Sequence, residues 1–170
     1  MAQRSTRQPS GKAMLYNFLL NELLASQAVA SYEFMVLSPW VTNFPLERPY
    51  HVTFSELVST KQEELHLFDV LRQIAANGGL VRITIGEDDR YHPPLRILRE
   101  RSSRIEVRVH RRLHAKAYVG RFGAVSGSLN LTDGGVNQNA EIYAYAHDPL
   151  SIAQLRQLCV EHFERAEPLP

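Results

Sequence analysis

The sequence predicts a single α/β domain in which a mixed, mostly parallel sheet is flanked by helices. Apolar runs of strand length alternate along the chain with segments whose apolar residues recur at helical spacing. One such run, Leu80 to Ile85, follows a helical segment that stops at Gly78-Gly79, which is the pattern of a right-handed crossover between parallel strands. With 170 residues, the chain is long enough for one domain with a buried core and too short for two ordinary domains.

The chain is expected to begin with an arm and a helix. Residues 1–12 are polar and basic and are predicted to form a disordered arm, so the domain is expected to span 13–166, with an unstructured tail at 167–170. Apolar residues recur at helical spacing from Ala13 to about Ala30, which indicates an amphipathic helix. Polar residues inside this run, among them Glu22, argue against a membrane span and against a secretory signal. We therefore expect a cytoplasmic protein.

A tryptophan follows the first predicted strand. This strand covers 32–37 and ends before Pro39, so that Trp40 lies in an irregular loop. Binding sites of α/β sheets collect at the carboxyl ends of strands, and Trp40 is therefore a candidate for stacking on a base or sugar of a substrate. A hydrophobic plug or a dimer contact is an equally good use of this side chain.

The rest of the chain continues the alternation of helices and strands. A helix capped by Ser55 or Thr60 is expected to run through Ala76. The single cysteine, Cys159, is expected to be a core thiol of the last helix. After Ala76 the predicted elements are a strand at 80–85, a polar loop at 86–94, a helix from Pro94 to about Arg101, a strand at 105–109, two strands within 113–119 and 123–128, a polar loop at 132–138, a strand at 141–146 and a helix from Pro149 to about Arg165.

Two pairs of polar residues interrupt apolar runs in the last third of the chain. His114 and Lys116 form one pair, Ser128 and Asn130 form the other, and the members of each pair are two residues apart. Side chains two apart on a strand point to the same face. If the two runs are antiparallel neighbours joined by the segment 120–122, all four polar groups converge at one place.

These residue types suit a phosphate group. Lys, Ser and Asn side chains donate hydrogen bonds to phosphoryl oxygens as charge develops on them. The imidazole of His114 is able to attack phosphorus or to transfer a proton near neutral pH. Glu141, on the next apolar run, is a candidate fifth member that would hold an imidazole in one tautomer. The sequence contains no H-x-x-H or C-x-x-C spacing that would indicate a metal site.

The combination of His114-Ala-Lys116, Gly127-Ser128-Leu-Asn130 and Asn139-Ala-Glu141 resembles the HKD motif of the phospholipase D superfamily. The resemblance covers the C-terminal third of the chain in detail and implies a phospholipase D-like α/β sandwich whose chemistry needs neither a metal ion nor another cofactor. The catalytic residues that it implies are His114, Lys116, Ser128, Asn130 and Glu141. The family pattern usually has an Asp five residues after the Lys, where this chain has Arg121.

The resemblance also implies a homodimer. Members of this family use two such motifs, one supplying the histidine that attacks phosphorus and the other the histidine that protonates the leaving group. This chain has no second H-x-K. Single-motif members are homodimers whose motifs face each other across a two-fold axis. A bell-shaped pH profile is expected of such paired histidines.

The charge of the chain is balanced overall but uneven along it. The 19 basic and 18 acidic residues leave a formal net charge of +1, which gives no global field for capturing a polyanion. Arginine is nevertheless concentrated just before His114, at positions 96, 99, 101, 104, 108, 111 and 112. Because Arg binds phosphate bidentately, this cluster is either a polyanion track or a solvated basic face. In the first case Arg111, Arg112 and Arg121 are candidate substrate-binding residues.

The function that these observations favour is a metal-independent phosphodiesterase, foremost a nuclease that hydrolyses DNA through a phosphohistidine at a site shared by two subunits. The family resemblance suggests a bacterial defence or DNA-modification system as its setting, with other subunits of that system as further partners. Three alternatives stay open: a nucleic-acid-binding module with a silent or partner-activated site, which Arg121 at the Asp position would explain, an enzyme that hydrolyses phospholipids, and a purely structural protein.

Overall fold

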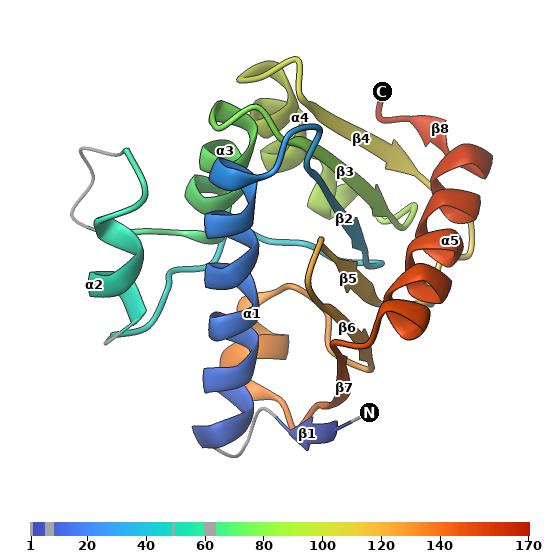
Figure 1. The fold of residues 1–170 in the computed structure, drawn as a ribbon. Helices are drawn as coiled ribbons and strands as arrows, with labels where there is room; N and C mark the ends of the chain where they lie inside the picture. The colour runs from blue at the N-terminus through green and yellow to red at the C-terminus, as the bar shows by residue number, and fades with distance from the viewer. Residues whose placement is uncertain (1, 6–8, 49, 60–63) are drawn as a thin grey trace.

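A single sheet organises the chain. The computed structural model describes residues 2–5, 9–48, 50–59 and 64–170. The strands are β1 (Ala2–Ser5), β2 (Glu33–Leu37), β3 (Leu80–Ile85), β4 (Ile105–Val109), β5 (Ala117–Val119), β6 (Ala124–Gly127), β7 (Ile142–Ala146) and β8 (Glu167–Pro168). The helices are α1 (Pro9–Ala28), α2 (Tyr50–Ser55), α3 (Leu67–Ala76), α4 (His92–Glu100) and α5 (Pro149–Arg165), with a 3-10 turn at Asp89–Tyr91 and a π-helical turn at Gly134–Gln138. In the described part of the chain these strands form one 8-stranded sheet in the order β1-β7-β6-β5-β2-β3-β4-β8 (Figure 1).

The centre of the sheet is parallel and its flanks are antiparallel. β2 pairs in parallel with β3, and β3 with β4, as the crossover before Leu80 predicted. The pairs β2–β5, β5–β6, β6–β7, β1–β7 and β4–β8 are antiparallel. The predicted α/β domain with a mixed sheet and flanking helices is confirmed, but its parallel part is smaller than expected. One reason is that the turn between β5 and β6 is too short for the crossover that parallel neighbours need.

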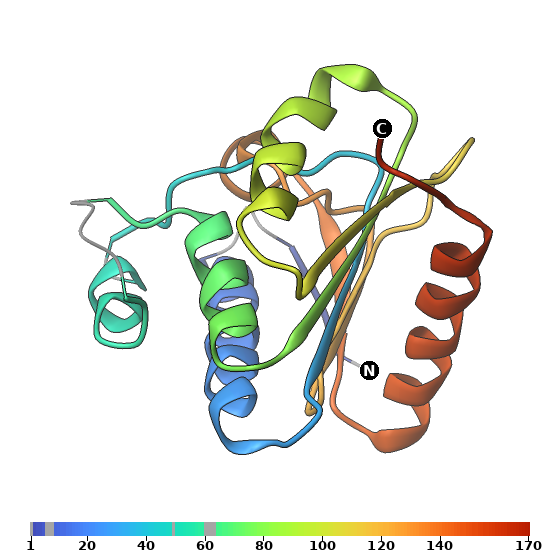
Figure 2. The same cartoon turned by 90° about the horizontal axis from the view of Figure 1, so that it is seen from above.

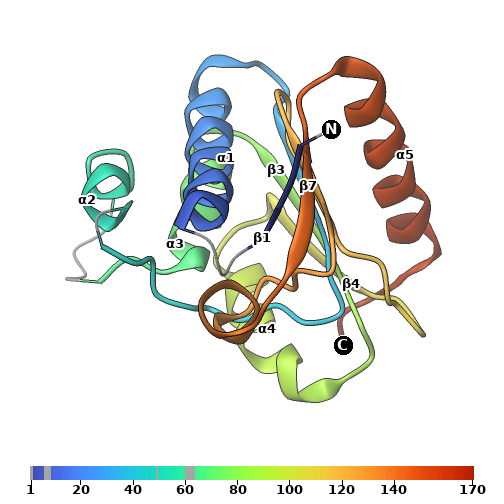
Figure 3. The same ribbon diagram turned by 90° about the horizontal axis from the view of Figure 1, so that it is seen from below.

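Helices cover both faces of the sheet. α1 and α3 pack together on one face and α5 lies on the other, so that three layers are visible when the sheet is seen edge-on (Figures 2 and 3). In β2, Phe34 and Val36 belong to the core beneath α1 and α3, whereas Met35 and Leu37 belong to the core beneath α5. This alternation is that of a strand buried on both faces. Cys159 is a buried free thiol in the core beneath α5, as expected.

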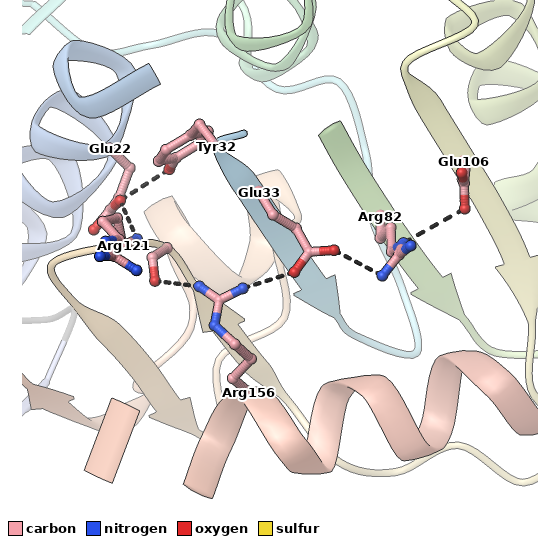
Figure 4. Close-up of polar contacts among 8 residues, drawn as sticks. Glu22, Tyr32, Glu33, Arg82, Glu106, Arg121 and Arg156 are labelled. Atoms are coloured by element: carbon pink, nitrogen blue, oxygen red, sulfur yellow. Dashed lines mark hydrogen bonds and ion pairs between the residues drawn. The ribbon is translucent and has the colours of Figure 1, made fainter. Parts of the chain in front are cut away.

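A series of ion pairs crosses the sheet beneath α5. Arg156 of α5 donates to the carboxylate of Glu33 (2.8 Å) and to the carbonyl oxygen of Gly120 (2.6 Å). Glu33 also pairs with Arg82 (2.7 Å), and a guanidinium nitrogen of Arg82 lies 3.5 Å from the carboxylate of Glu106 (Figure 4). Because each member is shared between neighbours, the series ties α5 to β2, β3, β4 and the turn after β5.

The first and last described segments form the two edges of the sheet. Ala2–Ser5 pairs with β7 where the sequence predicted a disordered arm over 1–12, and α1 begins at Pro9 inside that predicted arm. Residues 1 and 6–8 lie outside the described residues. At the other edge β8 pairs with β4 and Leu169 is buried, so the segment 167–170 is not the unstructured tail that was expected. The edges of a sheet offer unpaired N–H and C=O groups, which a segment without any apolar pattern is able to pair.

The helix predicted from Ser55 or Thr60 through Ala76 is in fact two helices. α2 ends at Ser55, and α3 begins only after His66, whose N–H donates to the carboxylate of Asp69 (2.8 Å). Thr60 lies outside the described residues. Among the helices that the structure describes, none is both long and apolar enough to cross a membrane.

Candidate active site

The two polar pairs meet at one end of the β5–β6 hairpin. The strands run antiparallel with Ala117 opposite Ser126. Lys116 precedes β5 and Ser128 follows β6, and the N–H of Gly127 donates to the carbonyl of Lys116 (3.3 Å), so the pairing continues into the polar segments. The hairpin predicted from the sequence is therefore confirmed, and it brings the H-x-K and S-x-N segments side by side.

The alternation of side chains before β5 decides where His114 and Lys116 point. Leu113, Ala115 and Ala117 pack with the core beneath α5. The intervening side chains of His114 and Lys116 consequently point to the opposite side. His114 is exposed and Lys116 is half-buried, which leaves both groups accessible to a ligand.

All four polar side chains line one cavity of about 860 Å³, next to the carboxyl-terminal ends of β2 and β3. Sites of α/β sheets are typically built at this end of the strands. The residues that line it are Pro39, Trp40, Gly86, Glu87, Asp88, Arg112, Leu113, His114, Ala115, Lys116, Gly127, Ser128 and Asn130. Of the predicted site residues, the structure thus brings together His114, Lys116, Ser128, Asn130, Arg112 and Trp40.

Glu141 supports Ser128 from the neighbouring strand segment. Its carboxylate accepts a short hydrogen bond from Ser128 Oγ and a second one from Asn139 Nδ2 (3.3 Å). Ser128 Oγ in turn accepts a hydrogen bond from the N–H of Ile142 (3.1 Å), so the hydroxyl is fixed both as a donor and as an acceptor. The sequence predicted that Glu141 would hold an imidazole, whereas these bonds within the chain show it fixing the hydroxyl of Ser128.

Lys116 is held next to His114 through the main chain. Its Nζ donates to the carbonyl oxygen of His114 (2.7 Å). Partial burial lowers the pKa of the Lys116 ammonium below its ordinary value, and the carboxylate of Glu141 acts in the opposite direction. An ammonium that is partly desolvated interacts more strongly with an incoming phosphate than one in bulk water.

A buried serine that sequence analysis missed supports Asn130. Ser38, directly after β2, is fully buried, and its Oγ lies 2.8 Å from the carbonyl oxygen of Trp40 and 3.2 Å from Asn130 Oδ1. Because Oδ1 of Asn130 faces Ser38, the Nδ2 amide group is the part left to donate toward a ligand. The available signal was a small polar residue placed between a buried strand and Pro39.

Gly127 permits the close approach of this segment to β7. Its φ is +155°, and a Cβ at this position would lie 2.4 Å from the carbonyl oxygen of Ile142. A side chain here would push the segment away from β7 and separate Ser128 from Glu141.

Arg121 lies at the far end of the hairpin, away from the cavity. It lines a separate cavity of about 490 Å³ together with Phe122 and His147, so its prediction as a substrate-binding residue is not supported. The buried Glu22 of α1 holds this turn: its carboxylate accepts from the hydroxyl of Tyr32 (2.8 Å) and from the N–H of Arg121 (2.7 Å) (Figure 4). It also accepts from the N–H of Phe122 (3.2 Å). The position where the family pattern has Asp is thus remote from the cavity, and helix α1 supplies a carboxylate to the turn.

The arginines before His114 mostly contact the C-terminal part of the chain. Their contacts are Arg96 with the carbonyl of Pro170, Arg99 with the carbonyl of Leu169, Arg108 with the carbonyl and ring of Phe163, and Arg111 with the carboxylate of Glu167 (3.8 Å). Arg112 lines the cavity, but Arg111 is not among the residues that do so. These contacts argue against a continuous polyanion track.

In the ranges that the structure describes, no group of three or more His, Cys, Asp or Glu side chains is arranged to hold a metal ion.

Comparisons with known proteins agree with the fold. A family model described as cardiolipin synthase, PLD-like domain, matches residues 51–166. No curated protein matches the chain by sequence. Among solved structures, the chain is similar to Nuc, a phospholipase D family member from Salmonella typhimurium, with a TM-score of 0.64 and 14% identity over 98% of this chain and 95% of that one. It is also similar to NucT from Helicobacter pylori (TM-score 0.62, 13% identity, 98% and 97% covered) and to TrmBL2, an archaeal chromatin protein (0.58, 14%, 99% and 53%).

At these identities the solved structures establish a common fold. The family model adds evidence at the level of sequence, because it spans most of the chain and includes both the H-x-K and the G-S-x-N segments. The chain therefore belongs to the phospholipase D superfamily.

Proposed function

We propose that this protein is a metal-independent phosphodiesterase, and specifically a nuclease that hydrolyses DNA. The observation that carries the proposal is the cavity in which an imidazole, an ammonium, a hydroxyl and a carboxamide lie together, from His114, Lys116, Ser128 and Asn130. This set supplies one nucleophile, His114, and two hydrogen-bond donors to phosphoryl oxygens, Lys116 and Asn130, while the hydroxyl of Ser128 is already bonded to Glu141. Membership of the phospholipase D superfamily supports the same chemistry.

The number of imidazoles supports a shared site. His114 is the single histidine among the described residues that line the cavity. The nearby His92 is buried, and its ring lies 3.2 Å from the carbonyl of Gly86. A reaction that needs both a nucleophilic and a proton-donating imidazole therefore requires a second chain, which a two-fold axis would place symmetrically.

The reaction would proceed in two steps. A ring nitrogen of His114 in one chain attacks phosphorus, while His114 of the second chain donates its proton to the departing oxygen as the P–O bond breaks. Water then attacks the phosphohistidine, its proton passes to the second, now neutral imidazole, and the P–N bond breaks. Lys116 and the amide of Asn130 stabilise the charge on the non-bridging oxygens, while Glu141 keeps Ser128 in place.

Cleavage of single-stranded and double-stranded DNA in excess EDTA tests this proposal. Wild-type protein is expected to cleave, and His114→Ala, prepared identically, is expected to lose activity while keeping its fold. Binding without cleavage by either protein would remove the proposal in favour of a binding module or a site activated by another subunit, for example in a bacterial defence system.

A phospholipid substrate is the second candidate, because the matching family model is described as a cardiolipin synthase. A phospholipid also presents a phosphodiester, and the groups in the cavity would serve it equally. Hydrolysis of anionic liposomes by wild type but not by His114→Ala, together with intact DNA, would establish this candidate.

A further inference from the structure

Trp40 is the sole tryptophan of the chain, and it lines the same cavity as His114 and Lys116. Its side chain is 43% exposed, which is high for so large an apolar group. The indole stacks on the ring of Tyr91, with centroids 6.1 Å apart and planes at 24°, and the guanidinium of Arg90 lies 5.8 Å from the centre of the Tyr91 ring. Arg90, Tyr91 and Trp40 form a stacked series, here named the aromatic wall, that ends at the cavity.

The backbone fixes Trp40 on both sides. Before it, the N–H of Gly86 donates to the carbonyl of Pro39 (3.0 Å). Its own carbonyl accepts from the buried Ser38 hydroxyl (2.8 Å), and the next residue, Val41, forms a bridge with Leu131. The indole is therefore positioned before any ligand arrives, which lowers the entropy lost on binding.

The groups around the cavity differ in charge. Lys116 and Arg112 are basic, whereas Glu87 and Asp88 contribute carboxylates from the loop that also carries the aromatic wall. The Arg90 guanidinium, 2.6 Å from Asp88, keeps the pKa of that carboxyl below its ordinary value, so Asp88 remains ionised at neutral pH. Because Arg90 offsets the charge of Asp88, a phosphate would be repelled mainly by the carboxylate of Glu87, while a neutral ring would not be.

We propose that the substrate class of this site is single-stranded nucleic acid, and that Trp40 stacks on an unpaired base next to the phosphate held by Lys116. The inference rests on the nuclease function proposed above. An unpaired base offers a free π-face to an aromatic side chain. A duplex stacks its bases internally and carries a second charged strand, and a phospholipid headgroup has no flat ring. Trp40 lies outside the residues 51–166 that match the family model, whereas Arg90 and Tyr91 lie inside them.

The volume of the cavity is compatible with this ligand. At about 860 Å³ it falls within the range of roughly 300–1,000 Å³ that small-molecule sites occupy. This volume is enough for one nucleotide, with its phosphate at the basic residues and its base at the aromatic wall.

Intrinsic fluorescence tests the inference directly, because all tryptophan emission comes from Trp40. His114→Ala protein, which cannot turn substrate over, is titrated with a single-stranded oligodeoxynucleotide, with an abasic strand of the same length and charge, and with the corresponding duplex. Vesicles of phosphatidylglycerol form a fourth arm. The single strand is expected to quench the emission and to bind about 5- to 150-fold more tightly than the abasic strand, the range that stacking of one base provides.

Two variants in the same background separate stacking from loss of fold. Binding is followed by the anisotropy of a labelled strand, since Trp40→Phe and Trp40→Ala have no tryptophan emission. Trp40→Phe keeps a ring and is expected to bind within a few-fold of its parent, whereas Trp40→Ala should match the weak binding of the abasic strand. Phe122→Ala, which removes an exposed ring from the other cavity, is the matched control and should leave binding unchanged.

The outcomes distinguish this inference from the nuclease proposal. Equal quenching and affinity for the single strand, the abasic strand and the duplex, or quenching by vesicles alone, would overturn base stacking at Trp40. Selective quenching by the single strand in a protein whose wild type cleaves nothing would leave the stacking inference standing and remove the nuclease function. Cleavage by the wild type, together with equal binding of the single strand, the abasic strand and the duplex, would keep the nuclease function and remove the stacking inference.

Discussion

The turn between β5 and β6 offers the sharpest test of how the site is held in place. A Cβ added at Gly120 would lie 2.1 Å from the carboxylate of the buried Glu22. Glu22 would have to move by more than 1 Å to restore ordinary contact, and it would then lose hydrogen bonds from Arg121, Phe122 or Tyr32. Hydrogen bonds to charged groups contribute about 1.5–3 kcal/mol each, so losing two of them predicts that Gly120→Ala lowers the free energy of unfolding by about 3–6 kcal/mol.

Urea unfolding at one fixed protein concentration measures this loss, and Gly134→Ala is its matched control. A Cβ at Gly134 would meet nothing closer than 3.9 Å, and this glycine lies in a helical turn. Alanine there is expected to change stability by less than about 1 kcal/mol, since it mainly restricts the unfolded chain. The same substitution is thus expected to destabilise the protein strongly at Gly120 and to change its stability little at Gly134.

A double variant separates the steric clash from other effects of alanine at Gly120. In Glu22→Ala protein the carboxylate is gone, and the added methyl group of Gly120→Ala occupies vacated space. The double variant should therefore be about as stable as Glu22→Ala alone, which corresponds to a coupling energy of about 3–6 kcal/mol between the two positions. Additive losses, or a Gly120→Ala variant as stable as Gly134→Ala, would refute the idea that Glu22 holds this turn.

Three further predictions concern charge and hydrogen bonding. Burial raises the pKa of Glu22 above its ordinary value of 4.5, so the folded state binds more protons than the unfolded state from 4.5 up to the raised pKa. The free energy of unfolding of the wild type should therefore rise, relative to Glu22→Gln, as pH falls through this window; parallel pH curves would contradict it. The carboxylate of Glu141 raises the pKa of Lys116, so Glu141→Gln should lower that pKa further and shift the loss of DNA binding at alkaline pH to lower pH. Ser128→Ala should weaken DNA binding without shifting the pH at which binding is lost. The buried Ser38 hydroxyl has a single proton to share between the Trp40 carbonyl and Asn130 Oδ1. Ser38→Ala removes this hydroxyl and should lower kcat by about tenfold, the equivalent of one neutral hydrogen bond, with KM nearly constant; a tenfold rise in KM instead would show that it acts on ground-state binding.

Much of the fold could be predicted because local pattern and tertiary structure agree. The strands Leu80–Ile85 and Ile105–Val109 and the helix Pro149–Arg165 have the bounds that periodicity predicted. The segments at the sheet edges could not be predicted in this way. β1 and β8 form because unpaired edge strands were available, a property of the assembled sheet and not of the residues 2–5 or 167–168.

In the candidate site too, residues set by local pattern could be predicted, and residues set by distant contacts could not. His114, Lys116, Ser128 and Asn130 were found because two strands with two-residue alternation carry them into one cavity. The local sequence around Glu22 shows only a charge in an apolar helix, because the N–H groups that it accepts from belong to a turn about a hundred residues away. Arg121 lies in the connection of the hairpin, at the opposite end from His114 and Lys116, which the predicted hairpin itself implies.

The contacts of the arginines with the C-terminal segment determine how this protein should respond to ionic strength. An arginine already bound to the protein's own carbonyls releases few counterions from a nucleic acid. If Lys116 and Arg112 make the phosphate contacts of each chain, the logarithm of the binding constant should fall with the logarithm of salt concentration with a slope of about −1.4 per chain. Between about 50 and 200 mM salt this amounts to a loss of about sevenfold. Uncharged contacts would then dominate recognition at physiological salt, and a strand captured weakly through its charge would be released readily after cleavage.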